Sequence, residues 1–445
     1  MQQFDTVILG GGPGGLAVAY GLHAQGQRVA VVEKDLWGGT CPNRGCDPKK
    51  ILMAAVEAQA RSATLQSHGL NGVPQLDWPA LMAKKRAYTS IIPGGTESGL
   101  KSAEIAHFHA AARFNADGSV QAGKDQLKAT NVVIATGQAP RLPHIAGQEW
   151  LRTSNDFLDL DHLPDDVTFM GAGYVGVELA TIANAAGRQV HLVHHSDRPL
   201  RAFDADLVQD LMSRLKAAGI DVQLMTDIVK VEPDGDEYRV TTKSGASWTT
   251  GMVFASAGRL PVIADLGLDQ VNVATTTHGI TVNDHLQTTN PHIFAIGDVV
   301  DRPQPKLTPV AGYEGRYVVT ALTATDAVDP IHYPAIPSVV YGKSQLAQIG
   351  VTPEQAQRDS QTYRVNDLDL THWFSYQRIE DPKARIKVVI ERASGRIVGA
   401  AVLSMEAEQV INYLAFVIQQ KLDSVAINQS ILAYPTLASD LTYFN

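Results

Sequence analysis

The chain has 445 residues, which is enough for about three domains of ordinary size. Its 44% hydrophobic and 19% charged residues are usual for a globular protein, and its 37 glycines and 22 prolines are too few for a collagen-like or disordered chain. The formal net charge is −9 and no block of Lys or Arg is present, so nucleic acid and anionic membrane surfaces are unfavourable partners.

No segment is predicted to cross a membrane or to direct secretion. The one candidate, residues 6–22, is interrupted by six glycines and Pro13, and Asp5 stands before it where a secretory signal has Lys or Arg. We therefore expect a cytoplasmic protein. The two cysteines, Cys41 and Cys46, are too few for a disulfide scaffold or a four-thiolate zinc site, so we expect no metal.

In chain order, the first predicted elements are a strand, a helix and a strand. Apolar residues 4–9 predict the first strand, residues 16–22 predict the helix, and β-branched residues at 28–32 predict the second strand. The same order returns in residues 167–193, again with a glycine-rich turn after the first strand. A βαβ unit is therefore predicted twice, although the two copies are too diverged to form a repeat array.

The later part of the chain predicts the remaining strands and a change of architecture. Three apolar runs each predict a buried strand that ends in a turn, at 131–137, 253–258 and 292–300. From about Pro337 the pattern changes to alternating strands and then to helices at 405–421, which predicts an antiparallel α+β domain. The predicted fold class is α/β, with two doubly wound (Rossmann-like) nucleotide-binding domains and a C-terminal antiparallel α+β domain. The predicted boundaries are 1–147 for the first domain, 148–262 for the second, 263–334 for a return to the first, and 335–445 for the C-terminal domain.

A glycine-rich turn stands between the first predicted strand and helix. Gly10, Gly12 and Gly15 fit the G-x-G-x-x-G pattern, and Glu33 ends the next strand. The glycines permit a tight turn and let backbone N–H groups approach a pyrophosphate, while the acid can accept hydrogen bonds from ribose hydroxyls. The pattern predicts a dinucleotide site, and the alternative is a glycine-rich turn without a ligand.

The second glycine-rich turn, residues 171–176, has the same setting but a different charge beside it. No acid stands directly at the end of the following strand, and His195, Arg198 and Arg201 come shortly after it. Cations there suit the 2′-phosphate of NADP, although Asp197 leaves NADH open. The alternative is a solvated basic turn.

The two cysteines lie in one short segment. Cys46 stands two residues before Pro48, which suits the first turn of a helix, and Lys49 follows. A thiol at the start of a helix and beside a cation has its thiolate stabilised. Cys41 and Cys46 therefore indicate a redox-active pair, and the alternatives are two buried reduced cysteines or part of a metal site.

These motifs together resemble the class I pyridine nucleotide-disulfide oxidoreductases, a flavoprotein family that includes glutathione reductase, lipoamide dehydrogenase and mercuric reductase. The resemblance covers essentially the whole chain and is closest to glutathione reductase. The segments that carry it are 10–15, 38–50, 135–137, 171–176, 258–259, 297–298 and 307–316.

The resemblance implies two cofactors, FAD at the first glycine-rich turn and NADPH at the second, with NADH still possible. The residues implied to hold FAD are Gly10, Gly12, Gly15, Glu33, Gly39, Thr40, Lys49, Thr136, Gly137, Gly297 and Asp298. The residues implied to hold NADPH are Gly171, Gly173, Tyr174, Gly176, His195, Arg198, Arg201, Gly258 and Arg259.

The resemblance also implies catalytic roles. Cys46 would be the charge-transfer thiol beside the flavin, and Cys41 would be the interchange thiol that attacks the substrate. Lys49 would pair with Glu178 beside flavin N5, and Tyr174 would be the flap that nicotinamide displaces. The alternative for Lys49 and Glu178 is an ordinary ion pair. The alternative for Tyr174 is a tyrosine that only packs at the start of a helix. The family further implies a homodimer.

The C-terminus departs from the family pattern. Disulfide reductases of the family carry His-Pro-Thr-x-x-Glu, whereas here Tyr434 stands at the His position, Ser439 at the Glu position, and Asp440 one place later. The histidine is a general acid-base group worth roughly 10²–10⁴ in rate, and a tyrosine with a pKa near ~10 is a poor base at neutral pH. We expect Tyr434 at least to orient the substrate.

Two arginines are candidate substrate residues. Arg316 matches a glutathione-contacting position of the family, with a solvated helix arginine as the alternative, and Arg44 places a charge in the redox loop, as Asp47 does. The first hypothesis is an enzyme that passes electrons from NADPH through FAD and the Cys41–Cys46 pair to a small polar disulfide. The alternative acceptor is a reactive oxidant, a quinone or a metal ion, because the family's histidine is absent. A third hypothesis is a flavin-binding scaffold or redox sensor with little turnover.

Overall fold

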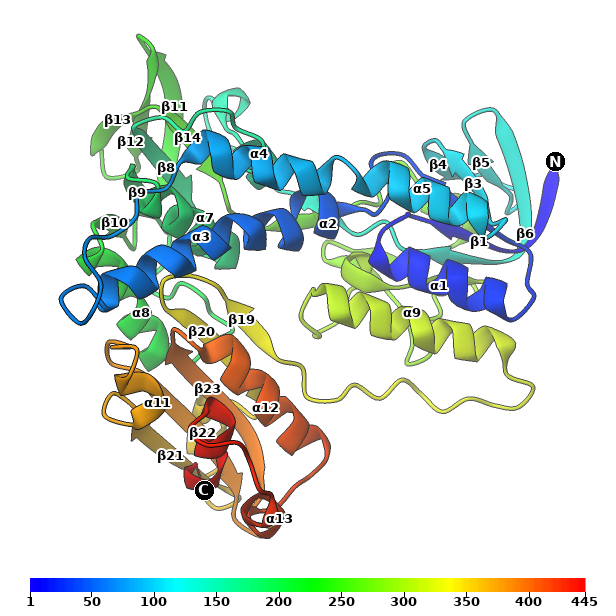
Figure 1. Ribbon diagram of the computed structural model, residues 1–445. Helices are drawn as coiled ribbons and strands as arrows, with labels where there is room; N and C mark the ends of the chain where they lie inside the picture. Colours follow the sequence, from blue (N-terminus) through cyan, green and yellow to red (C-terminus); the bar gives the residue numbers. More distant parts are fainter. Residues whose placement is uncertain (445) are drawn as a thin grey trace. The chain divides into compact units, whose positions relative to one another are not determined.

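The structure, a computed structural model, describes residues 1–444, which form two compact units. Unit 1 consists of Met1–Lys50, Ala83–Arg141 and Gly258–His332, and unit 2 consists of Ile51–Met82, Leu142–Ala257 and the chain from Tyr333 on (Figure 1). Each unit therefore combines segments that are far apart in the sequence. None of the helices within residues 1–444 is long and apolar enough to cross a membrane.

Unit 1 is organised around a seven-stranded sheet in the order β3-β2-β1-β6-β5-β4, with β18 paired to β6. The parallel strands are β1 (Gln2–Leu9), β2 (Val29–Glu33), β3 (Ala106–His109), β6 (Asp125–Ile134) and β18 (Ile293–Ala295), and β4 (Ala112–Phe114) and β5 (Val120–Ala122) form an antiparallel extension. Val7, Ile8 and Leu9 on β1 are completely buried, because both faces of the sheet are covered. The predicted strand, helix and strand at the N-terminus are confirmed.

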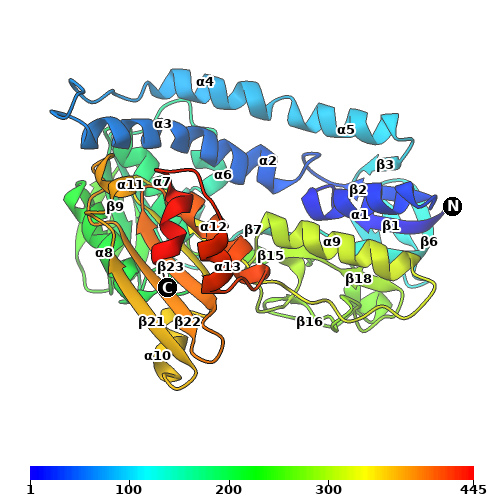
Figure 2. The ribbon, with the colours of Figure 1, turned by 60° about the horizontal axis from the view of Figure 1, so that its bottom comes forward.

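Alternation along β1 separates two cores in unit 1. Ile8 faces α1 (Pro13–Ala24) and α9 (Thr308–Thr323), which lie side by side (Figure 2). Val7 and Leu9 face the opposite core, which includes residues between 266 and 300. The other elements of unit 1 are α2 (Thr40–Arg44), the start of α3 (Cys46–Thr64), the end of α4 (Trp78–Thr89), α5 (Ile92–Ser102), β7 (Gln138–Pro140), β15 (Arg259–Pro261), β16 (Thr275–Thr276), β17 (Gly279–Ile280), η2 (Leu268–Val271) and η3 (Gly297–Val299).

Unit 2 contains the second βαβ arrangement. A four-stranded parallel sheet has the order β10-β9-β8-β14. The elements of this region are β8 (Asp166–Met170), α7 (Tyr174–Ala185), β9 (Gln189–Val193), α8 (Ala205–Ala217), β10 (Ile220–Gln223), β14 (Met252–Ala255), a meander of β11 (Ile228–Asp234), β12 (Glu237–Thr242) and β13 (Ser247–Thr250), α6 (Ser154–Phe157) and η1 (Gln148–Trp150). In its core, where α7 covers the sheet, Phe169 and Phe254 stack, and Phe157 packs edge-on against Phe254.

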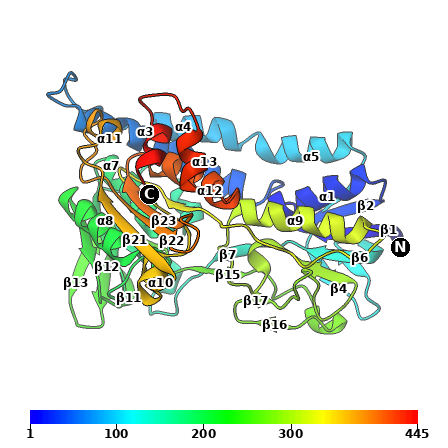
Figure 3. The ribbon, with the colours of Figure 1, turned by 90° about the horizontal axis from the view of Figure 1, so that it is seen from below.

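The C-terminal part of unit 2 is a five-stranded antiparallel sheet, as the sequence predicts. Its order is β19-β20-β23-β22-β21, and α12 packs on β20 and β23. Figure 3 shows β21, β22 and β23 next to one another. The elements are β19 (Ser338–Val340), β20 (Gln345–Gly350), α10 (Pro353–Arg358), β21 (Tyr363–Asp369), α11 (Phe374–Gln377), β22 (Arg385–Glu391), β23 (Ile397–Ser404), α12 (Ala407–Gln419), α13 (Ser424–Gln429) and η4 (Leu437–Tyr443).

A buried lysine joins this C-terminal sheet to α8. Lys387 Nζ on β22 lies 2.9 Å from Asp204 Oδ1 and 2.6 Å from Asp206 Oδ2, and the side chains of Lys387 and Asp204 are 3% and 2% exposed. Asp204 also caps α8 by accepting a hydrogen bond from Leu207 N. Burial alone would lower the pKa of Lys387, but the hydrogen bonds to the two carboxylates raise it. The lysine is therefore charged and compensates a buried carboxylate.

Replacing Lys387 by Met should destabilise unit 2, because Asp204 would remain buried without its cation. We expect a loss of about 3–5 kcal/mol in unfolding free energy, the usual cost of breaking a buried pair. Thermal and urea unfolding of Lys387→Met measure the loss, with Lys216→Met on the exposed side of α8 as the control. Unchanged unfolding midpoints for Lys387→Met would contradict the assignment.

Candidate active site

The turn between β1 and α1 requires glycine at two positions. Gly10 has φ +116°, and a Cβ there would collide with the carbonyl oxygen of Ala135, the residue that follows β6. A Cβ on Gly15 would collide with the carbonyl oxygen of Gly10. These close approaches hold the N-terminus of α1 against the sheet. No side chain caps this helix start at Gly12, so its backbone N–H groups are available for an anion.

The side chains next to this turn fit the adenosine and pyrophosphate part of FAD. Glu33 is 9% exposed and accepts hydrogen bonds at 2.7 Å from Gly11 N and from Asp35 N. The ring of Trp37 lies against Gly11, and its buried indole N–H has no hydrogen-bond partner among residues 1–444. Gly39, with φ +70°, approaches Gly12 so closely that a Cβ would lie 2.6 Å from its Cα. Thr40 begins α2 directly after it.

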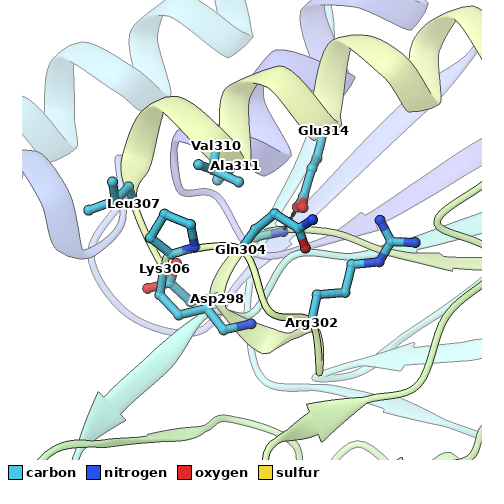
Figure 4. Close-up of a pocket in the computed structure, with 10 residues that line it drawn as sticks. Asp298, Arg302, Gln304, Lys306, Leu307, Val310, Ala311 and Glu314 are labelled. Atoms are coloured by element: carbon cyan, nitrogen blue, oxygen red, sulfur yellow. Dashed lines mark hydrogen bonds between the residues drawn. The ribbon is translucent and has the colours of Figure 1, made fainter. Parts of the chain in front are cut away.

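A second cluster of unit 1 surrounds η3 and the start of α9 (Figure 4). Glu314 Oε2 accepts a hydrogen bond of 2.6 Å from Gly297 N, and Lys306 Nζ donates to Val300 O. Burial raises the pKa of Asp298 against the opposing charges of Arg259 and Lys306. The Oε1 atom of Gln304 is buried without a partner among the described residues. The half-buried carboxyl of Asp298 and the unpaired amide oxygen of Gln304 fit a polyhydroxy chain such as the ribityl group of FAD.

The remaining cofactor residues of unit 1 lie around β7 and β15. Thr136 Oγ1 donates to Val262 O at 2.8 Å, and Gly137 has φ +66°. Arg259 Nη2 donates to Gln138 O at 2.6 Å. Gly258 and Arg259, which the sequence assigns to NADPH, therefore belong to unit 1, and the charge of Arg259 acts on Asp298. Their contact with NADPH stays a prediction.

Cys41 on α2 and Cys46 at the start of α3 are both free thiols, and they lie close enough for each to shift the pKa of the other. Cys46 Sγ also lies 3.6 Å from Thr308 Oγ1, at the start of α9. The hydrogen bond from Cys41, together with Thr308 and the charge of Lys49, lowers the pKa of Cys46 to about 6. The same hydrogen bond and burial raise the pKa of Cys41. The pair therefore consists of a thiolate at Cys46 and a thiol at Cys41 at neutral pH.

Charged and polar side chains surround the pair. Tyr88 Oη donates to Asp47 Oδ2 at 2.7 Å, and Cys41 Sγ lies 3.9 Å from Asp47 Oδ1. Arg44, a predicted substrate residue, forms an ion pair with Asp35. Sequence reasoning did not find Tyr88 or Thr308, because neither belongs to the cysteine motif and only the fold brings them to it.

Arg316, the other predicted substrate residue, lies on α9, far along the sequence from Arg44, Asp47 and Tyr88. It is exposed, and its guanidinium carbon lies 6.0 Å from the centre of the Tyr313 ring. The structure therefore places Arg316 on the same helix as Thr308, eight residues further on. Its contact with a substrate stays a prediction.

Unit 2 repeats the glycine turn at β8 and α7. Gly171 has φ +118°, and a Cβ on Gly171 or on Gly176 would collide with Ser256 O or Gly171 O. No side chain caps the start of α7 at Gly173. Tyr174 is the first residue of the helix and is 48% exposed.

A cavity of about 340 Å³ lies beside this turn. His194, His195, Arg198 and Arg201 line it, as does Tyr174. His194 Nδ1 accepts a hydrogen bond from Ala172 N at 3.2 Å, and burial followed by the charge of His195 lowers the pKa of His194. His194 is therefore neutral near pH 7, and Arg198 and Arg201 carry the positive charge of this wall. The cavity fits a phosphorylated nucleotide.

One arginine of this cavity has a partner that the sequence did not predict. Arg198 Nη2 forms an ion pair with Glu354 on α10 and donates to Phe203 O at 3.4 Å. Glu354 also accepts a hydrogen bond from Ala205 N at 3.2 Å. The C-terminal part of unit 2 thus contributes a carboxylate that holds one arginine of the cavity wall.

The other predicted catalytic residues are placed as follows. Glu178 is 4% exposed and accepts a hydrogen bond from Tyr341 N at 3.0 Å within unit 2. Lys49 belongs to unit 1, and its pairing with Glu178 stays a prediction.

The residues at the family's C-terminal motif are divided between surface and interior. Tyr434 is 78% exposed, whereas Asp440 is 8% exposed, and burial raises the pKa of Asp440. The hydroxyl of Ser439 donates to Thr436 O at 2.6 Å, in the capping of η4. Ser439 therefore has a structural role, and Asp440 is held in the interior of the C-terminal part.

The chain matches two parts of one protein family. Residues 4–315 match the profile described as "Pyridine nucleotide-disulphide oxidoreductase", and residues 336–443 match the dimerisation domain of that family. The chain is 30% identical over 440 residues to a glutathione reductase of Burkholderia cepacia, covering 98% of this chain and 97% of the relative. It is 27% identical over 452 residues to a dihydrolipoyl dehydrogenase of Bacillus subtilis, covering 98% and 96%. It is 28% identical over 447 residues to a dihydrolipoyl dehydrogenase of Chlamydia muridarum, covering 98% and 95%.

Alkylation should distinguish the two thiols of the reduced protein. Cys46 should react with iodoacetamide at neutral pH. Its alkylation rate should fall to about half of its maximum near pH 6, because only the thiolate is nucleophilic. Cys41 should react much more slowly over the same range. Peptide mass spectrometry after short pulses measures both rates. Equal rates for the two cysteines, with a midpoint near the usual thiol value of 9.0, would contradict the assignment.

Proposed function

Because the chain belongs to the pyridine nucleotide-disulphide oxidoreductase family, we propose that it uses NADPH to reduce a small polar disulfide through Cys41 and Cys46. The family consists of FAD-dependent enzymes that use pyridine nucleotides, so the chain is an oxidoreductase. The observation that carries the proposal is the pair of free thiols in one short segment, Cys41 on α2 and Cys46 at the start of α3. Bound FAD would supply the two-electron link between the nicotinamide and this pair.

The two units divide the proposed binding work. Unit 1 would hold FAD with the uncapped start of α1, Glu33 and the cluster at Asp298. The match to the family's dimerisation domain supports a boundary near 335 and a homodimer. We propose that the FAD-binding parts are 1–147 and 263–334, the NADP-binding part is 148–262, and the dimerisation part is 335–445.

The cavity beside α7 supports NADPH rather than NADH. His195, Arg198 and Arg201 line it at the place where an NAD-specific site carries an acid for the ribose hydroxyls. Arginine guanidinium groups suit a 2′-phosphate because they form charge-assisted hydrogen bonds with its oxygens. Glu354 opposes this preference, since it already holds Arg198.

The thiols support a disulfide as the acceptor. Cys46 as thiolate would lie on the flavin side, and Cys41 would attack the substrate, which is the order expected from the family. A second candidate function, reduction of a reactive oxidant, a quinone or a metal ion, is favoured by Tyr434, which stands where the family has its proton-transferring histidine. Such acceptors need no proton delivered to a departing thiolate.

Oxidation of NADPH with glutathione disulfide tests the proposal. We expect the purified protein to turn over far above a blank without acceptor, and Cys41→Ser and Cys46→Ser to abolish this turnover while both variants keep FAD. Absorbance at 340 nm follows the reaction, and the flavin spectrum checks cofactor retention. If NADPH reduces the flavin but every disulfide gives the blank rate, whereas a quinone is reduced rapidly, the second function replaces the first.

Two substitutions at the cavity should shift nucleotide preference in opposite directions. Arg201→Ala should raise the KM for NADPH roughly ten- to hundredfold and leave that for NADH nearly unchanged, because one charged hydrogen bond is worth about 1.5–3 kcal/mol. Glu354→Gln should lower the KM for NADPH, because it releases Arg198. Steady-state kinetics with both nucleotides measure the effects, with Arg239→Ala on β12 as the control. Parallel changes for NADPH and NADH would show that the cavity does not read the 2′-phosphate.

A further inference from the structure

A chain of three polar groups ends at the sulfur of Cys41. Tyr88, in the last turn of α4, donates to Asp47 Oδ2 at 2.7 Å, and Asp47 Oδ1 lies 3.9 Å from Cys41 Sγ, where it can accept the hydrogen of the thiol in place of Cys46. All three residues belong to unit 1, so the arrangement needs no second copy of the chain. Nucleophile, base and orienting group in hydrogen-bonded order are the general signature of an activated nucleophile.

The direction of the hydrogen bond between Tyr88 and Asp47 is well defined. The hydrogen bond to Asp47 raises the pKa of Tyr88, so its phenol keeps its proton and acts only as a donor to Asp47. One carboxylate oxygen is thereby occupied, and the other is directed at the thiol. Asp47 is the second residue of α3, so its carboxylate lies at the positive end of that helix.

Cys41 needs a proton acceptor before it can attack a substrate. Its pKa is raised, chiefly by its hydrogen bond with Cys46 and by burial, so it is a thiol at neutral pH. Only the thiolate is nucleophilic. The family position for a base holds Tyr434, whose phenol is a poor base. Asp47 is the carboxylate that contacts the Cys41 sulfur.

We propose that Asp47 is the general base and acid for Cys41, and that Tyr88 is the positioning residue that holds it. This rests on the proposed disulfide reductase function. Asp47 takes the Cys41 proton while the sulfur attacks one sulfur of the substrate disulfide, forming a mixed disulfide and breaking the substrate S–S bond. Asp47 returns the proton to the departing thiolate, which leaves as a thiol.

The second step of the disulfide exchange completes the transfer of electrons to the substrate. The Cys46 thiolate attacks Cys41 Sγ, forms the Cys41–Cys46 disulfide and releases the other half of the substrate as a thiolate. The protein pair loses two electrons, and the substrate disulfide gains them. One proton passes from Cys41 to the first product, and the charge of the Cys46 thiolate passes to the second.

If Asp47 acted only as a fixed negative charge, its removal would change the rate of attack by Cys41 in the opposite direction to the removal of a base. As a fixed negative charge, Asp47 raises the pKa of Cys41 and of Cys46 and disfavours both thiolates. Removing only this charge would therefore speed the attack of Cys41. Removing a base would slow it. The sign of the change in rate decides between the two roles.

The test measures the oxidative half of the cycle alone. Holoenzyme reduced by one equivalent of NADPH is mixed with bis(2-hydroxyethyl) disulfide, a neutral probe that the charge of Asp47 neither attracts nor repels. We expect Asp47→Asn to slow reoxidation about ten- to hundredfold, at the low end of general base catalysis because a carboxylate is a weak base for a thiol. Reduction by NADPH and FAD content should be unchanged. Asp265→Asn, an exposed carboxylate of the same unit, is the control.

Two further variants separate chemistry from structure. Formate should restore part of the lost rate in Asp47→Ala, and chloride at the same ionic strength should not. Tyr88→Phe should slow the oxidative half several-fold in the wild-type background and have no further effect in Asp47→Asn, because the two residues act as one unit. Tyr20→Phe is the matched control, since Tyr20 and Tyr88 are each 39% exposed.

The outcomes distinguish this inference from the proposed function. If the wild-type dithiol fails to exchange with the probe and with glutathione disulfide, the proposed function is wrong and the inference falls with it. If wild type exchanges and Asp47→Asn exchanges equally fast or faster, the proposed function stands and the base role of Asp47 is overturned. Additive effects of the Asp47 and Tyr88 variants would overturn the positioning role of Tyr88.

Discussion

The close approach of backbone to backbone at two glycine turns is the constraint on which both nucleotide sites depend. Gly10, with φ +116°, lies against the carbonyl of Ala135, and Gly171, with φ +118°, lies against the carbonyl of Ser256. No side chain fits at either place. The helix that follows each turn is thereby held with its uncapped N-terminus at the carboxyl edge of a parallel sheet, where an anionic group is stabilised.

The environment of the two thiols makes them chemically unequal. A hydrogen bond, a threonine hydroxyl and a lysine favour the thiolate of Cys46, while Cys41 keeps its proton. The same segment therefore supplies an electron-rich sulfur and a protonated one. Tyr434 stands at the position of the family's histidine, and the neighbouring carboxylate of Asp47 is the group that we propose accepts that proton.

The C-terminal part of unit 2 also acts on the nucleotide region. Lys387 compensates the buried Asp204 that caps α8, and Glu354 holds Arg198 in the wall of the basic cavity. A carboxylate on a phosphate-binding arginine weakens the attraction for an anion but fixes the position of the guanidinium. The ion pair thus connects the antiparallel sheet with the basic cavity that we propose binds NADPH.

Local patterns in the sequence determined the two βαβ units, the glycine turns, the basic segment after β9 and the cysteine pair at a helix start, because spacing and residue type alone fix those features. The partners of the cysteines and of Arg198 were decided only by tertiary structure. Tyr88 lies 41 residues from Asp47, Thr308 lies 262 residues from Cys46, and Glu354 lies 156 residues from Arg198. Contacts over such separations depend on how helices and sheets pack, and no local propensity encodes them.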